Sequence, residues 1–88
     1  MDILYFPLIE QDDFDSFRRI MHDELPSTHK EWLQRHADRV AHYRETHRIV
    51  DVKVKASDFT AYLHASSHGT NLKSLWDFAE FIAKRNKN

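Results

Sequence analysis

Residues 49–56 read Ile-Val-Asp-Val-Lys-Val-Lys-Ala, an alternation of apolar and charged side chains. A period of two residues is typical of a β-strand that buries one face and leaves the other in water. The neighbouring segments carry apolar residues three and four positions apart, which is the spacing along one face of a helix. A strand between helices predicts an α+β domain.

The segment before this strand is expected to form the longest helix, over residues 29–47. Thr28 is followed three residues later by Glu31, a capping-box pattern that begins helices. Neither glycine nor proline interrupts the segment. The sequence therefore predicts one continuous helix that leads into the strand.

A shorter helix is expected over residues 12–24. Asp12 or Asp13 offers its N-cap, and Pro26 ends it because a proline disfavours α geometry at the preceding residue. The apolar residues at helical spacing are Phe14, Phe17, Met21 and Leu25. Before this helix, residues 2–9 form a short run rich in β-formers, which predicts an opening strand. Pro7 cannot donate a ladder hydrogen bond, so this strand should lie at an edge or end near Pro7.

Two further helices are expected after the alternating strand. Ser57 or Asp58 caps the first, which should stop near Ser67 because Gly69 suits a helix end. Thr70 or Asn71 caps the second, which runs to about Lys84. The resulting order is β-α-α-β-α-α, a mostly helical single domain over residues 1–88 whose two short strands are covered by helices.

Composition excludes several classes of function. The chain of 88 residues has no cysteine, so neither disulfides nor thiolate zinc sites are possible. It begins without a signal-peptide pattern and lacks an apolar run of about 20 residues, so a cytoplasmic protein without a membrane partner is expected. The net charge is −1 and the basic residues are interleaved with acids, so no nucleic-acid partner is expected. No nucleophile elbow frames a serine, and the sequence favours a protein that is not an enzyme and has no cofactor.

Seven histidines are the natural candidates for metal or acid–base chemistry. His29, His36 and His47 fall on the apolar arc of the helix predicted over residues 29–47. Successive members are about 10 and 16 Å apart along the axis, too far for one metal ion. We expect half-buried imidazoles packed among aromatic rings, each with a polar atom nearby. An alternative hypothesis is that their protonation near pH 6 affects stability or partner binding.

His64 and His68 are four residues apart, a spacing at which two imidazoles on a continuous helix can share a metal ion. The residues between them are Ala-Ser-Ser and do not complete a zinc signature. The following turn leads into a helix N-terminus, where His68, Thr70 and Asn71 are candidates for binding an anion. These residues support the alternative function, a small metal- or anion-binding protein.

In the last predicted helix the apolar side chains point in too many directions around the helix axis to be buried by one contact face. Its apolar residues spread over about 160° of the helical wheel, and Phe81 points to the opposite side. The residues inside this arc are Leu72, Leu75, Trp76, Phe78, Ala79, Ile82 and Ala83. Such a helix is either packed between other elements of its own chain or meets a second molecule. The favoured prediction is a non-enzymatic protein-interaction module that binds a protein partner or forms a homodimer. The predicted surface consists of Trp76, Phe78, Phe81 and Ile82.

Overall fold

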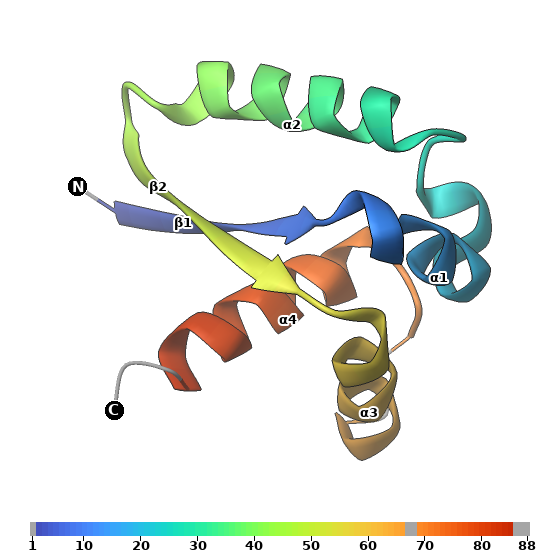
Figure 1. Ribbon diagram of the computed structural model, residues 1–88. Helices are drawn as coiled ribbons and strands as arrows, with labels where there is room; N and C mark the ends of the chain where they lie inside the picture. Colours follow the sequence, from blue (N-terminus) through green and yellow to red (C-terminus); the bar gives the residue numbers. More distant parts are fainter. Residues whose placement is uncertain (1, 67–68, 86–88) are drawn as a thin grey trace.

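The elements follow the order β-α-α-β-α-α in the computed structural model, which describes residues 2–66 and 69–85 (Figure 1). This order and the α+β class confirm the sequence prediction. The elements are β1 (Asp2–Ile9), α1 (Gln11–Met21), the 3₁₀ helix η1 (His22–Glu24), α2 (His29–Tyr43), β2 (His47–Val54), α3 (Ala56–Ser66) and α4 (Leu72–Arg85). None of the helices in the described part of the chain is both long and apolar enough to cross a membrane.

β1 and β2 pair in parallel, in a register that runs from Asp2 opposite His47 to Ile9 opposite Val54. Parallel neighbours need a long crossover connection, and α1 and α2 supply it. Among the described residues the sheet has only these two strands, so β1 is an edge strand as Pro7 predicts.

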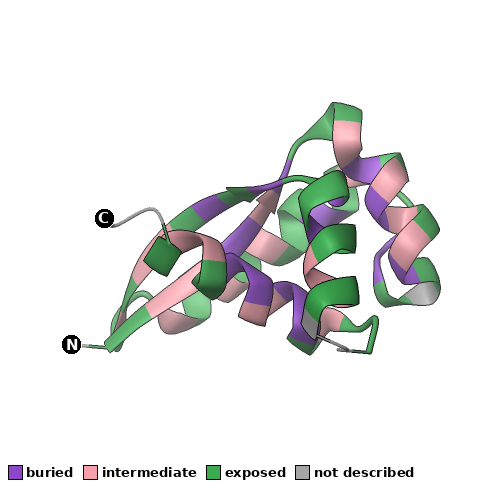
Figure 2. Cartoon of the chain, turned by 90° about the horizontal axis from the view of Figure 1, so that it is seen from below, coloured by how far each residue is buried: buried purple, intermediate pink, exposed green. Residues whose placement is uncertain are grey.

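The two faces of the sheet have different coverings. Val52 and Val54 of β2 are buried, whereas Asp51 and Lys53 between them are exposed, which confirms the predicted alternation. The valine face packs against α4, and α2 lies over the other face (Figure 1). Figure 2 shows that buried residues gather where the helices meet the strands.

The hydrophobic core joins α1, α3 and α4 to the valine face of the sheet. Its centre is a row of phenylalanine rings: Phe17 lies 5.8 Å from Phe59, which lies 5.4 Å from Phe78. These separations are typical of packed aromatic pairs. The buried apolar cluster comprises Ile9, Phe14, Phe17, Met21, Leu25, Trp32, Val52, Val54, Ala56, Phe59, Leu75, Phe78 and Ala79.

Three elements have boundaries that differ from the prediction. α2 ends at Tyr43 rather than at residue 47, because the chain turns over residues 44–46 and His47 begins β2 opposite Asp2. β2 accordingly begins and ends two residues earlier than predicted. α1 ends at Met21, where His22 adopts a positive φ of 52° and the chain continues as η1.

The predicted caps of α2 and α4 are confirmed, whereas the cap predicted for α3 at Ser57 or Asp58 is wrong because both residues lie inside that helix, which begins at Ala56. Thr28 accepts a hydrogen bond from the Glu31 amide at 3.1 Å, and Asn71 accepts one from the Ser74 amide at 2.9 Å. The capping role of Asp12 or Asp13 in α1 was wrong, because Glu10 is the N-cap and gives no side-chain bond.

The Asp13 carboxylate instead caps a different helix. It accepts a hydrogen bond from the backbone amide of Ala56, the first residue of α3, at 2.7 Å. Lys55 stands at the position before α3, where a short polar acceptor is usual, and its own carbonyl accepts from the Phe59 amide. α1 therefore provides the side-chain cap that the sequence around α3 lacks.

Candidate functional site

The four predicted surface residues of α4 do not form one surface. Phe78 is only 1% exposed and belongs to the core, so its assignment to an interaction surface is corrected. It is buried because α4 is packed between the sheet and α3. Trp76 is directed toward α2, whereas Phe81 and Ile82 line a groove beside α3.

Trp76 is occupied by contacts within the chain. Its ring lies 4.6 Å from the ring of Phe6 in β1, and the Arg39 guanidinium of α2 lies 5.6 Å from the centre of the indole. A cation above an indole face is attracted by the ring quadrupole. For Trp76, packing between elements of the same chain explains the apolar spread of α4 without a second molecule.

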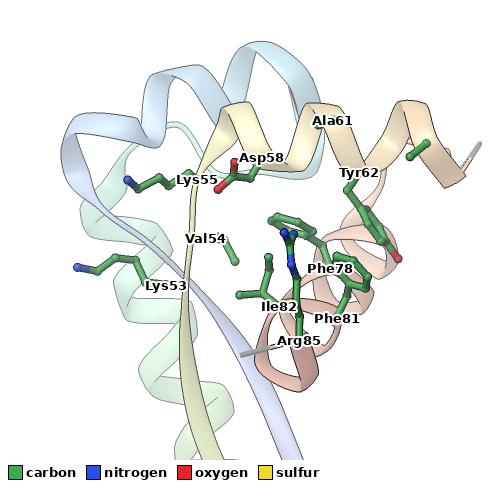
Figure 3. A pocket seen from close by; sticks show the side chains of 11 residues that line it. Lys53, Val54, Lys55, Asp58, Ala61, Tyr62, Phe78, Phe81, Ile82 and Arg85 are labelled. Carbon is green, nitrogen blue, oxygen red and sulfur yellow. The ribbon is translucent and has the colours of Figure 1, made fainter. Parts of the chain in front are cut away.

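A groove of about 590 Å³ lies between the end of β2, α3 and α4 (Figure 3). Its walls combine the valine face of the sheet with small and aromatic residues of the two helices. The lining residues are Lys53, Val54, Lys55, Asp58, Ala61, Tyr62, Ala65, Phe78, Phe81, Ile82 and Arg85. The interior of the groove is therefore mainly apolar, and its charged groups come from the strand end and the helix termini.

Phe81 is the exposed aromatic residue of this groove. It is 45% exposed, although its ring lies 5.2 Å from that of Tyr62, which in turn lies 5.2 Å from Phe78. The three rings form a row that leads from the core to the surface. Phe81 thus continues the core outward into the groove.

The solvent face of α4 beside the groove carries paired charges. Lys73 and Asp77 are 3.0 Å apart, and Lys84 and Glu80 are 3.2 Å apart, each pair at the i,i+4 spacing of a hydrated helix face. The exposed apolar area of α4 is consequently narrow and centred on Phe81.

Lys53 and Glu10 form an ion pair at the edge of the groove, with Nζ and Oε1 2.9 Å apart. The hydrogen bond and charge attraction of Lys53 lower the pKa of Glu10 below its usual 4.5. The same contacts with Glu10 raise the pKa of Lys53 above 10.5. Both groups are exposed, so solvent screens the pair and its contribution to stability is small.

His29 and His36 are half-buried, each beside an aromatic ring and a polar partner, which confirms the structural interpretation for these two residues. Nε2 of His29 donates to the Ile9 carbonyl at 2.7 Å, and the imidazole lies 5.4 Å from Phe14. Nε2 of His36 lies 3.0 Å from an Asp51 oxygen, and the ring lies 5.6 Å from Phe6. The two histidines attach α2 to the sheet. His47 lies in β2 and not on the predicted helix, but its imidazole is also half-buried, 5.7 Å from the ring of Tyr43 and with Nδ1 2.9 Å from the Thr46 hydroxyl, so the structural interpretation holds for it too.

The metal and anion candidates remain predictions. His64 is exposed on α3, and His68 lies outside the described residues. Within residues 2–66 and 69–85 no three His, Asp or Glu side chains are grouped so as to hold a metal ion. Thr70 is exposed, and Asn71 already accepts hydrogen bonds from the amide and hydroxyl of Ser74. One amide of the suggested anion site is therefore satisfied by the protein itself.

No family model matches this chain, and no curated protein or solved structure shows significant similarity to it. The sequence singled out Phe81 and Ile82 but missed Tyr62 and Arg85, which the groove adds to them. Arg85 resembles an ordinary helix-ending cation in the sequence, and Tyr62 an ordinary core residue of α3. Only the packing of α3 beside α4 brings these side chains to one groove.

Proposed function

We propose that this domain is a non-enzymatic protein-interaction module that holds a segment of a partner protein in the groove between α3 and α4. The observation that carries the proposal is the position of Phe81, 45% exposed at the groove. Single exposed apolar residues are ordinary on protein surfaces. Phe81 differs because its ring continues an aromatic row into a concave, mainly apolar groove.

The shape of the groove indicates the form of the ligand. Grooves between packed elements commonly receive a helix or an extended peptide through a few apolar anchors. The ion-paired outer face of α4 is hydrated and adds little to such a contact. We therefore expect one or two apolar side chains of the partner to pack against Phe81, Tyr62 and Ile82.

A partner segment fits this groove better than a second copy of the chain. In a two-fold symmetric dimer the same patch is used by both subunits. The charged residues that line the groove are three cations, Lys53, Lys55 and Arg85, and one carboxylate, Asp58. A symmetric dimer through this groove joins two such positive surfaces, and like charges at an interface are unfavourable. The expectation is a monomer that binds a different protein.

The experiment is a selection of random peptides on the immobilised domain, followed by fluorescence anisotropy with the enriched peptides. Phe81→Ala should weaken the main class of peptides about tenfold, equivalent to about 1.4 kcal/mol. Leu33→Ala is the matched control, because Leu33 is similarly exposed at 41% but lies on α2. It should leave binding unchanged.

Two results contradict the proposal. If no peptide is enriched, or if every enriched peptide binds Phe81→Ala as well as the original protein, the groove is not the binding site. If sedimentation shows a dimer that Phe81→Ala dissociates, a second copy fills the groove. Circular dichroism establishes that both variants are folded, as expected for two half-exposed positions.

A further inference from the structure

A second partly apolar surface lies at the start of β2, at the opposite end of the strand from the groove between α3 and α4. Two adjoining hollows of about 700 and 310 Å³ share His47. They are bordered by the second half of α2 and by the first residues of the two strands, which Figure 1 shows together at one end of the molecule. We call this the arginine-lined surface; its residues are Ile3, Leu4, Arg39, Val40, Tyr43, Arg44, His47, Arg48, Ile49 and Trp76.

The three arginines of this surface have no acidic partner within the part of the chain that the structure describes. Arg39, Arg44 and Arg48 form no ion pair with any carboxylate of the described residues. By contrast, Arg35, four residues before Arg39 on α2, lies 4.0 Å from Glu31 at the i,i+4 spacing. The positive charges of Arg39 in α2, Arg44 directly after it and Arg48 in β2 are thus left available for a partner.

The arginines surround apolar side chains rather than one another. Ile3 is 40% exposed, and Val40 and Ile49 are half-buried beside it. Arg39 is held against the face of Trp76, which leaves the N–H groups at its edge free to donate. A guanidinium presents paired donors that match the two oxygens of a carboxylate.

From this combination we propose that the arginine-lined surface binds an acidic segment of a partner protein in which apolar residues alternate with Asp or Glu. The carboxylates of the partner segment accept hydrogen bonds from the arginines, and its apolar residues cover Ile3, Val40 and Ile49. A nucleic-acid backbone offers phosphates to the arginines but no apolar groups to cover the apolar side chains between them. The proposal is independent of the groove between α3 and α4.

The test is a random-peptide selection on the Phe81→Ala variant, so that peptides bound at the groove are selected against. The enriched peptides should contain Asp or Glu next to apolar residues. The double variant Arg44→Glu, Arg48→Glu should weaken them about tenfold, and added salt should weaken them further. Arg35→Glu is the charge-reversal control, since Arg35 is an arginine of α2 that lies outside the hollows, and it should have little effect.

Other occupants give distinguishable results that overturn the proposal. Phosphatidylserine vesicles and duplex DNA are tested in parallel against the original protein and the double variant. The proposal is refuted if only the vesicles or the DNA bind in an arginine-dependent way, or if the double variant abolishes a dimer seen in sedimentation. It also fails if the selected peptides are neutral or basic, or if no peptide is enriched. The peptide-binding test of the groove at Phe81 does not depend on any of these outcomes.

Discussion

Replacing Asp13 with alanine should destabilise the domain at the junction of α1 and α3. The Asp13 carboxylate accepts the Ala56 amide hydrogen at 2.7 Å and is half-buried. Asp13 and Ala56 are far apart in the sequence, so the bond ties the start of α3 to α1. Without it, the first amide of α3 loses its side-chain acceptor.

The magnitude follows from two descriptions of the same bond, which are not added together. A hydrogen bond to a charged group contributes roughly 1.5–3 kcal/mol, and loss of a helix N-cap costs roughly 0.5–2 kcal/mol. For a half-buried bond we expect a loss of about 1.5–2 kcal/mol. In a domain of this size that loss lowers Tm by roughly 6–16 °C.

The assay is urea unfolding followed by circular dichroism, with Asp12→Ala as the matched control. Asp12 is exposed, carries the same charge and also lies in the first turn of α1, so both variants lose the same favourable interaction with the helix dipole. The difference between them isolates the bond to Ala56. Equal midpoints for the two variants, with unchanged m values, would refute the capping role of Asp13.

Two other predictions concern ion pairing and the attachment of α2. The Glu10 pKa is lowered, so its pair with Lys53 stabilises the fold above pH 4.5 and that contribution disappears as the pH falls through the lowered value. In urea unfolding measured across pH, Glu10→Gln should therefore reduce the loss of stability on the acid side. Glu45→Gln is the control and should keep that loss. If the Glu10→Gln profile runs parallel to that of the original protein, the Glu10–Lys53 pair does not contribute to the acid dependence. His29→Ala should lower the free energy of unfolding by about 1–2 kcal/mol, because the Ile9 carbonyl loses a donor at 2.7 Å. An unfolding midpoint unchanged from that of the original protein would show that the bond contributes nothing.

Interactions between residues close in the sequence were predictable because a helix or strand repeats a fixed geometry. The valine alternation specified β2 and the exposure of Asp51 and Lys53, and Thr28 and Asn71 specified where α2 and α4 begin. The end of α2 was not predictable in this way. Residues 44–47 can continue a helix as far as local preference is concerned, and the pairing of His47 with Asp2 makes β2 start there.

The candidate surfaces depended on contacts between distant segments. The helical wheel of α4 identified Phe81 as the residue outside the apolar arc, but the predicted interaction surface combined it with Phe78 and Trp76 from inside that arc. The structure buries Phe78 in the core and places Trp76 beneath Arg39. Local spacing cannot separate these residues, because it fixes their directions around one helix and not the element each direction meets.

The sequence by itself determined the element order, the alternating burial of β2 and two helix caps, since each depends on residues within about four positions of one another. The tertiary structure decided the parallel pairing, the capping of α3 by Asp13, the groove at Phe81 and the gathering of three arginines around Ile3. Each of these needs groups that are distant in the chain, and the packing of the whole core determines which of those groups meet.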